Sequence, residues 1–110
     1  MGRFETTVPL YAELRPPYPA EFFRAVAEKL GFSRRDALID LGTGPGLLAL
    51  GFAAYVGRIT GVDPEPAILA VARQAAEARK QDFVLIEGNA EALPDSIGQF
   101  DVITIGRALH

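Results

Sequence analysis

The sequence has no cysteine and only one histidine among its 110 residues. Disulfide bonds and cysteine nucleophiles are therefore excluded, and a metal site built on Cys and His ligands has little support. The absence of cysteine leaves the redox compartment undetermined.

Long apolar runs and basic clusters are also missing. Hydrophobic residues make up 49% of the chain without forming a stretch long enough to predict a membrane span. The net charge is −3, with 11 basic and 14 acidic residues, and no basic cluster predicts a nucleic-acid partner. Nothing at the N-terminus has the pattern of an export signal, so we expect a cytoplasmic protein.

The most informative stretch present is ALIDLGTGPG, residues 37–46. Residues 37–41 form a short, nearly continuous apolar run, which is typical of a strand buried on both faces of a parallel sheet. Gly42, Gly44 and Gly46 follow at a spacing of two, where a backbone turns sharply and allows a ligand close approach. An apolar segment then predicts a helix from about residue 46 to 55. This strand, turn and helix predict a cofactor-binding site.

The spacing of the glycines helps to choose between cofactors. A dinucleotide fingerprint that starts at Gly42 requires glycine or alanine at position 47, where this chain has Leu47. Residues 59–63 read as a second strand that ends in Asp63, about 20 residues after the turn, where a ribose-binding carboxylate is expected. A nicotinamide-dependent oxidoreductase half-domain remains an alternative, although Leu47 counts against it.

Strand and helix patterns alternate along the rest of the chain. Further strands are expected at 83–87 and 101–105, and further helices at 20–30 and 66–80. This alternation predicts an α/β protein with a Rossmann-like, doubly wound parallel sheet and right-handed crossovers. We expect one domain over 1–110, with 1–19 as a lid segment and 20–110 as the core.

Five motifs in order resemble the class I S-adenosylmethionine-dependent methyltransferases, in the UbiE-like or type 11 branch. The chain has DLGTGPG at 40–46, GVDPE at 61–65, GNAEALP at 88–94 and FDVITIGRALH at 100–110. YAELRPPYP at 11–19 is similar to the N-terminal lid of many such enzymes. The resemblance implies strand order 3-2-1-4, S-adenosylmethionine as cofactor and in-line methyl transfer to a small-molecule acceptor.

The resemblance also implies residues for each part of the cofactor. The residues that would hold the methionine part are Asp40, Gly42, Gly44, Gly46 and Gly106, and Tyr11 and Arg15 would reach its carboxylate. Those for the ribose and adenine are Asp63, Pro64, Asn89, Ala90 and Glu91. Many relatives carry Asp where this chain has Asn89, whose amide both donates and accepts hydrogen bonds.

Simpler interpretations remain open for several of these residues. Asp63 and Pro64 also fit a helix N-cap followed by proline at the first helical position. Asp40 also fits a buried acid whose hydrogen bonds are satisfied by nearby amides. His110 is a candidate general base, but a terminal histidine is usually exposed, and methyl transfer from a sulfonium does not always need a base.

Class I methyltransferases usually carry three more strands after the fourth, and these are missing here. We therefore expect a truncated domain in which the strand at 101–105 lies at an open sheet edge. Self-association through that edge would cover it. A non-catalytic S-adenosylmethionine-binding fragment or interaction module is accordingly an alternative to a complete enzyme.

Overall fold

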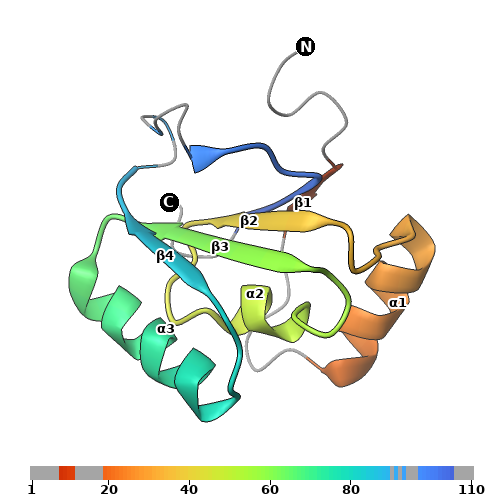
Figure 1. The fold of residues 1–110 in the computed structure, drawn as a ribbon, viewed down its shortest axis with the longest axis horizontal. Helices are drawn as coiled ribbons and strands as arrows, with labels where there is room; N and C mark the ends of the chain where they lie inside the picture. Colours follow the sequence, from red (N-terminus) through yellow and green to blue (C-terminus); the bar gives the residue numbers. More distant parts are fainter. Residues whose placement is uncertain (1–7, 12–18, 90, 92, 94–96, 106–110) are drawn as a thin grey trace.

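A computed structural model describes residues 8–11, 19–89, 91, 93 and 97–105. Within these residues the chain forms five strands and three helices (Figure 1). In chain order these are β1 (Val8–Tyr11), α1 (Ala20–Leu30), β2 (Ala37–Leu41), α2 (Leu47–Gly51), β3 (Arg58–Asp63), α3 (Pro66–Ala78), β4 (Val84–Glu87) and β5 (Val102–Ile105).

The strands form one parallel sheet in the order β1-β5-β2-β3-β4. Read from β4 to β5, the four expected strands have the order 3-2-1-4, which confirms the prediction. The chain moves outward from β2 through β3 to β4 and then returns to the other side of β2. This reversal makes the β2–β5 boundary the topological switch point, where ligands of open α/β sheets bind.

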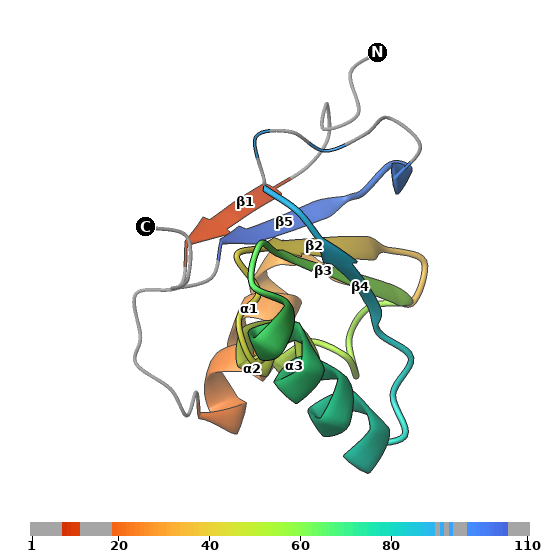
Figure 2. The ribbon, with the colours of Figure 1, turned by 90° about the vertical axis from the view of Figure 1, so that its left-hand side faces the viewer.

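The expectation of an open edge at β5 is wrong. The strand β1, which lies inside the segment expected to be a lid, pairs in parallel with β5 over residues 8–11 and 102–105 (Figure 2). Pro9 is compatible with this pairing because β1 is an edge strand, and an edge strand has one side that needs no amide donors. The premise for self-association through that edge is thereby removed.

The three helices cover one face of the sheet (Figures 1 and 2). Side chains alternate along each strand, so Leu38 and Val102 contact the helices while Ile39 and Ile103 lie on the opposite face. The β4–β5 connection supplies the cover of this second face through Leu93, Ile97 and Phe100. The sheet is thus a middle layer with a helical layer on one side and a thin cover on the other.

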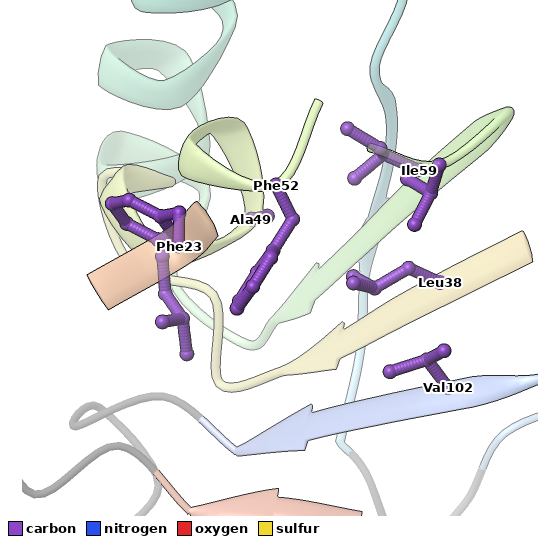
Figure 3. Packing of buried hydrophobic residues seen from close by; sticks show 8 residues of the cluster. Phe23, Leu38, Ala49, Phe52, Ile59 and Val102 are labelled. Atoms are coloured by element: carbon purple, nitrogen blue, oxygen red, sulfur yellow. The ribbon is translucent and has the colours of Figure 1, made fainter. Parts of the chain in front are cut away.

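Phe23 and Phe52 pack among aliphatic side chains in the core beneath the helices (Figure 3). The Phe52 ring is fully buried and meets the Phe23 ring edge to face, with 4.9 Å between centroids. Phe32 approaches Phe52 at 5.5 Å. Such pairs contribute roughly 0.5–1.5 kcal/mol each beyond the burial of their area. They fix α1 and the segment after α2 against the sheet.

One helix is clearly shorter than expected, and the cap of another is a different residue from the one proposed. The helix α2 ends at Gly51 rather than near residue 55, because the chain continues in tight turns in which Phe52 and Ala53 bond back three residues. The N-cap of α3 is Glu65, followed by Pro66, so the alternative in which Asp63 is the cap and Pro64 follows it is wrong. Among the described residues, no helix has the length and apolarity needed to cross a membrane.

Candidate functional site at the carboxyl edge of the sheet

The glycine turn leaves β2 at the switch point and leads into α2. Gly42, Gly44 and Gly46 have φ values of 69°, 55° and 85°, a conformation that side chains with a Cβ rarely adopt. The sequence prediction of a turn that demands glycine is therefore confirmed by the backbone. Thr43 and Pro45 lie between them, the first buried and the second exposed.

Backbone hydrogen bonds hold this turn against β3. The Thr43 amide donates to the Val62 carbonyl at 2.9 Å, and the Gly46 amide donates to the Thr43 carbonyl at 2.9 Å. The Gly44 amide donates to Asp63 Oδ2 at 3.0 Å. Because these three amides already have acceptors inside the protein, the shape of the turn is fixed before any ligand binds.

Asp40 is a fully buried carboxylate directly below the turn. It stands between Thr104 of β5 and Gly61 of β3 in the sheet register. Its Oδ1 accepts from the Thr104 hydroxyl at 2.6 Å and its Oδ2 accepts from the Thr43 hydroxyl at 2.7 Å. The acid therefore links β2, β5 and the glycine turn.

The charge of Asp40 is unfavourable in this environment. The pKa of Asp40 is raised from an ordinary 3.8 to about 6, mainly by burial and to a smaller extent by the nearby Asp63 carboxylate, while hydrogen bonds from the two threonine hydroxyls lower it. Among the described residues, ion pairs are made only by Arg24 with Glu21 and Glu28 on α1. Asp40 thus has hydrogen-bond donors but no cation beside it in the described part of the chain.

Asp63 is the last residue of β3 and is only 2% exposed. In addition to the Gly44 amide on Oδ2, its Oδ1 accepts from the Glu65 amide at 2.9 Å. Its backbone carbonyl accepts from the Gly88 amide at 3.1 Å. One residue therefore connects the glycine turn, the start of α3 and the end of β4.

The Phe83 ring lies against the two glycines at the back of the turn. A Cβ at Gly61 would come within 2.8 Å of the ring and within 2.9 Å of the Thr43 methyl group. A Cβ at Gly46 would lie 3.0 Å from the ring and 3.3 Å from Ala72. Glycine at these positions lets Phe83 and α3 pack closely behind the turn, so this side of Gly46 contacts the protein interior.

The remaining predicted residues lie around this centre to different extents. Pro64, Asn89 and Glu91 are exposed, and they follow β3 and β4 at the carboxyl edge. The backbone of Tyr11 ends β1 and pairs with Ile105 at the same edge. Four predicted residues lie outside the described residues, namely Arg15, Ala90, Gly106 and His110.

Three residues of the site were not predicted as functional. Thr43 and Thr104 donate to Asp40, and Phe83 supports the glycines. A hydroxyl in the otherwise apolar run VITI at 102–105 was the available signal for Thr104. No comparable signal marks Phe83, because an aromatic residue beside a strand is typical of any core.

Comparison with known proteins identifies a methyltransferase family and several methyltransferases as similar to this chain. A family described as "Methyltransferase domain" matches residues 38–110. A demethylmenaquinone methyltransferase of Thermus thermophilus is 43% identical over 70 residues, which cover 62% of this chain and 32% of that protein. The uncharacterized methyltransferase YcgJ of Bacillus subtilis is 36% identical over 104 residues, which cover 83% of this chain and 41% of that protein.

Solved structures show the same similarity in three dimensions. The crystal structure of the Bacillus YcgJ protein superposes with a TM-score of 0.69 and 28% identity, over 82% of this chain and 39% of that one. An S-adenosylmethionine-dependent methyltransferase of Clostridium acetobutylicum superposes with a TM-score of 0.70 at 18% identity, which supports the fold alone. The chain spans about a third to two fifths of the curated relatives described here.

Proposed function

The chain belongs to the methyltransferase domain family, and on this premise we propose that it holds S-adenosylmethionine for methyl transfer to a small-molecule acceptor. The single observation that carries this proposal is the hydrogen bond from the Gly44 amide to Asp63 Oδ2 at 3.0 Å. It fixes the acid at the end of β3 beside the glycine turn that leaves β2, next to the switch point where a nucleoside ligand of such a sheet binds. The family assignment favours this reaction over the nicotinamide-dependent alternative.

The donor set suits the two ends of this cofactor. Asp40 is an anion without a neighbouring cation among the described residues, so the ammonium of the methionine part would compensate its charge. Each Asp63 oxygen already accepts one amide and has a second lone pair with which to accept a ribose hydroxyl. Pro64 and Asn89 are exposed beyond β3 and β4 and would contact the adenine.

The protein's contribution to the reaction would be positioning. S-adenosylmethionine, when bound, supplies a methyl group that is already activated on a sulfonium sulfur. The preformed turn and Asp63 would then hold the donor in one orientation, and alignment with the acceptor supplies much of the rate in such a transfer. A general base is not required for every acceptor, so the proposal does not depend on His110.

Titration calorimetry of the chain with S-adenosylhomocysteine tests the cofactor site. Asn89→Ala tests the adenine contact without disturbing the fold, because the Asn89 side chain is exposed and its removal leaves the core unchanged. Loss of one or two hydrogen bonds predicts an affinity roughly 3–10 fold weaker. Gln74→Ala removes a similar amide from an exposed position on α3 and serves as the matched control.

The outcomes separate the alternatives. Equal affinities of Asn89→Ala and Gln74→Ala would contradict the adenine contact, and a folded chain that does not bind the ligand would refute the cofactor site. Binding without methyl transfer to any small-molecule acceptor of a screened set would favour the non-catalytic binding module.

A further inference from the structure

A groove runs over α2 on the helical face, between α1 and the end of α3. It has a volume of about 520 Å³, within the range of small-molecule sites. Figure 1 shows α2 between α1 and α3, and α2 has 5 residues where its neighbours have 11 and 13. The short helix therefore forms the floor of a depression with a longer helix on each side.

The floor of the groove is apolar and tightly packed. Leu47 and Leu50 of α2 line it together with Phe23 of α1 and Tyr55. A Cβ at Gly51 would lie only 2.0 Å from the Phe23 ring, so glycine at this position allows α1 to pack directly on α2. The apolar surface is consequently held in place by the core and does not depend on a ligand.

The rim of the groove is positively charged, whereas the whole chain has a net charge of −3. Arg34 Nη1 donates to the carbonyls of Ala53 and Ala54 at 3.2 Å each, which fixes the guanidinium and leaves its other N–H groups available. Arg79 lies on the other side, and the ion pairs among described residues are those of Arg24 alone. None of the described residues that line the groove is acidic.

From this arrangement we infer that the groove is a second binding site, specific for a small apolar molecule that carries one carboxylate or phosphate group. The apolar body would lie on Leu47, Leu50 and Tyr55. The anionic group would bind between Arg34 and Arg79, because guanidinium groups pair with carboxylate and phosphate through parallel hydrogen bonds. This site shares no lining residue with the glycine turn, Asp40 or Asp63.

The probe pair for a test is 2-naphthoate and its uncharged amide, 2-naphthamide, titrated into the isotope-labelled chain and followed by amide chemical shifts. A ligand of this size predicts a Kd between about 0.1 and 1 mM for naphthoate. The shifts should concentrate on residues 47–55 and 79–81. Naphthamide should bind roughly 5–10 fold more weakly, because it cannot pair with the arginines.

The variant Arg79→Gln should weaken naphthoate binding by roughly the same factor and leave naphthamide binding unchanged. Arg73→Gln is the matched control, since it removes an equal charge from α3 at a residue that does not line the groove. Thermal melting of both variants verifies that they are folded.

Equal binding of naphthoate and naphthamide, equal effects of the two substitutions, or shifts concentrated at the carboxyl edge would each overturn the inference. None of these readouts uses S-adenosylhomocysteine, so failure here is distinct from failure of the proposed function.

Discussion

Replacing Asp40 by Asn should stabilise the ligand-free chain at neutral pH. Burial raises the pKa of Asp40 from 3.8 to about 6, and a shift of about 2 units corresponds to about 3 kcal/mol. When folding raises the pKa of a carboxyl group, the group makes its full contribution to the stability of the folded state at pH values below its unfolded pKa. That stability is lost as the pH rises through the folded pKa, so above about pH 6 the charged wild-type side chain carries the whole cost.

Denaturant unfolding of wild type and Asp40→Asn across about pH 4 to 7 measures this effect. The difference in the free energy of unfolding between the two proteins should change in favour of the variant by about 2.5 kcal/mol over this range and then level off. The amide keeps one oxygen as an acceptor, and either Thr43 or Thr104 can turn its hydroxyl to accept from the new NH₂ group. Any loss from imperfect geometry is independent of pH and leaves the slope intact.

The control is Asp82→Asn, which removes a carboxylate from an exposed position and so reports the effect of net charge alone. A difference between wild type and Asp40→Asn that does not vary with pH beyond the Asp82→Asn control would refute the reasoning. It would mean that water or a rearranged side chain solvates the Asp40 carboxylate and removes the energetic cost of its charge.

Three further predictions concern residues that support the candidate site or the groove over α2. Thr104→Val should raise the pKa of Asp40 further and cost about 1–3 kcal/mol at pH 7, with a smaller loss at pH 5, as measured by denaturant unfolding. Gly46→Ala should cost about 1–3 kcal/mol, because its φ of 85° is strained for alanine and its Cβ would press on Phe83, and it should weaken S-adenosylhomocysteine binding in calorimetry. Gly51→Ala should lower the melting temperature through its clash with the Phe23 ring, whereas Gly88→Ala, whose Cβ would meet nothing within 4 Å, should leave it nearly unchanged.

The elements α1 and β2 and the glycine turn were predictable because their sequence signals are local. The strand at 37–41 begins and ends where expected, and α1 spans 20–30 as the apolar spacing indicated. The glycine spacing predicted a turn with left-handed residues, and the structure has three of them. Each of these features depends on a short stretch of chain whose periodicity or backbone requirement is visible in the residues themselves.

The strand β1 was not predictable in the same way. A segment with proline at its second position is a poor candidate for a strand, and only the free edge of β5 makes the pairing favourable. The strand β5 lies almost 100 residues further along the chain, since Val8 of β1 pairs with Val102 of β5. Likewise, the role of Phe83 depends on Gly46 and Gly61 both lying against its ring, which only the packed structure shows.

The two threonines around Asp40 bear on why the charge is present at all. Asn could accept from one hydroxyl and donate to the other, so hydrogen bonding alone does not require an acid at this position. An acid that costs about 3 kcal/mol in the free chain is explained if a cationic ligand group compensates it, because stability is often lower where binding requires it.

This explanation predicts that ligand binding releases a proton. A cation that binds near Asp40 lowers its pKa, so at about pH 6, where the group is half protonated, binding of S-adenosylhomocysteine should release up to about half a proton. Calorimetry in buffers of different ionisation enthalpy counts that proton. Release should vanish near pH 8 and in Asp40→Asn at every pH. Release that persists unchanged in the variant would place the titrating group elsewhere, and Asp40 would then be a structural link between β2 and β5 that keeps its charge for reasons unrelated to the ligand.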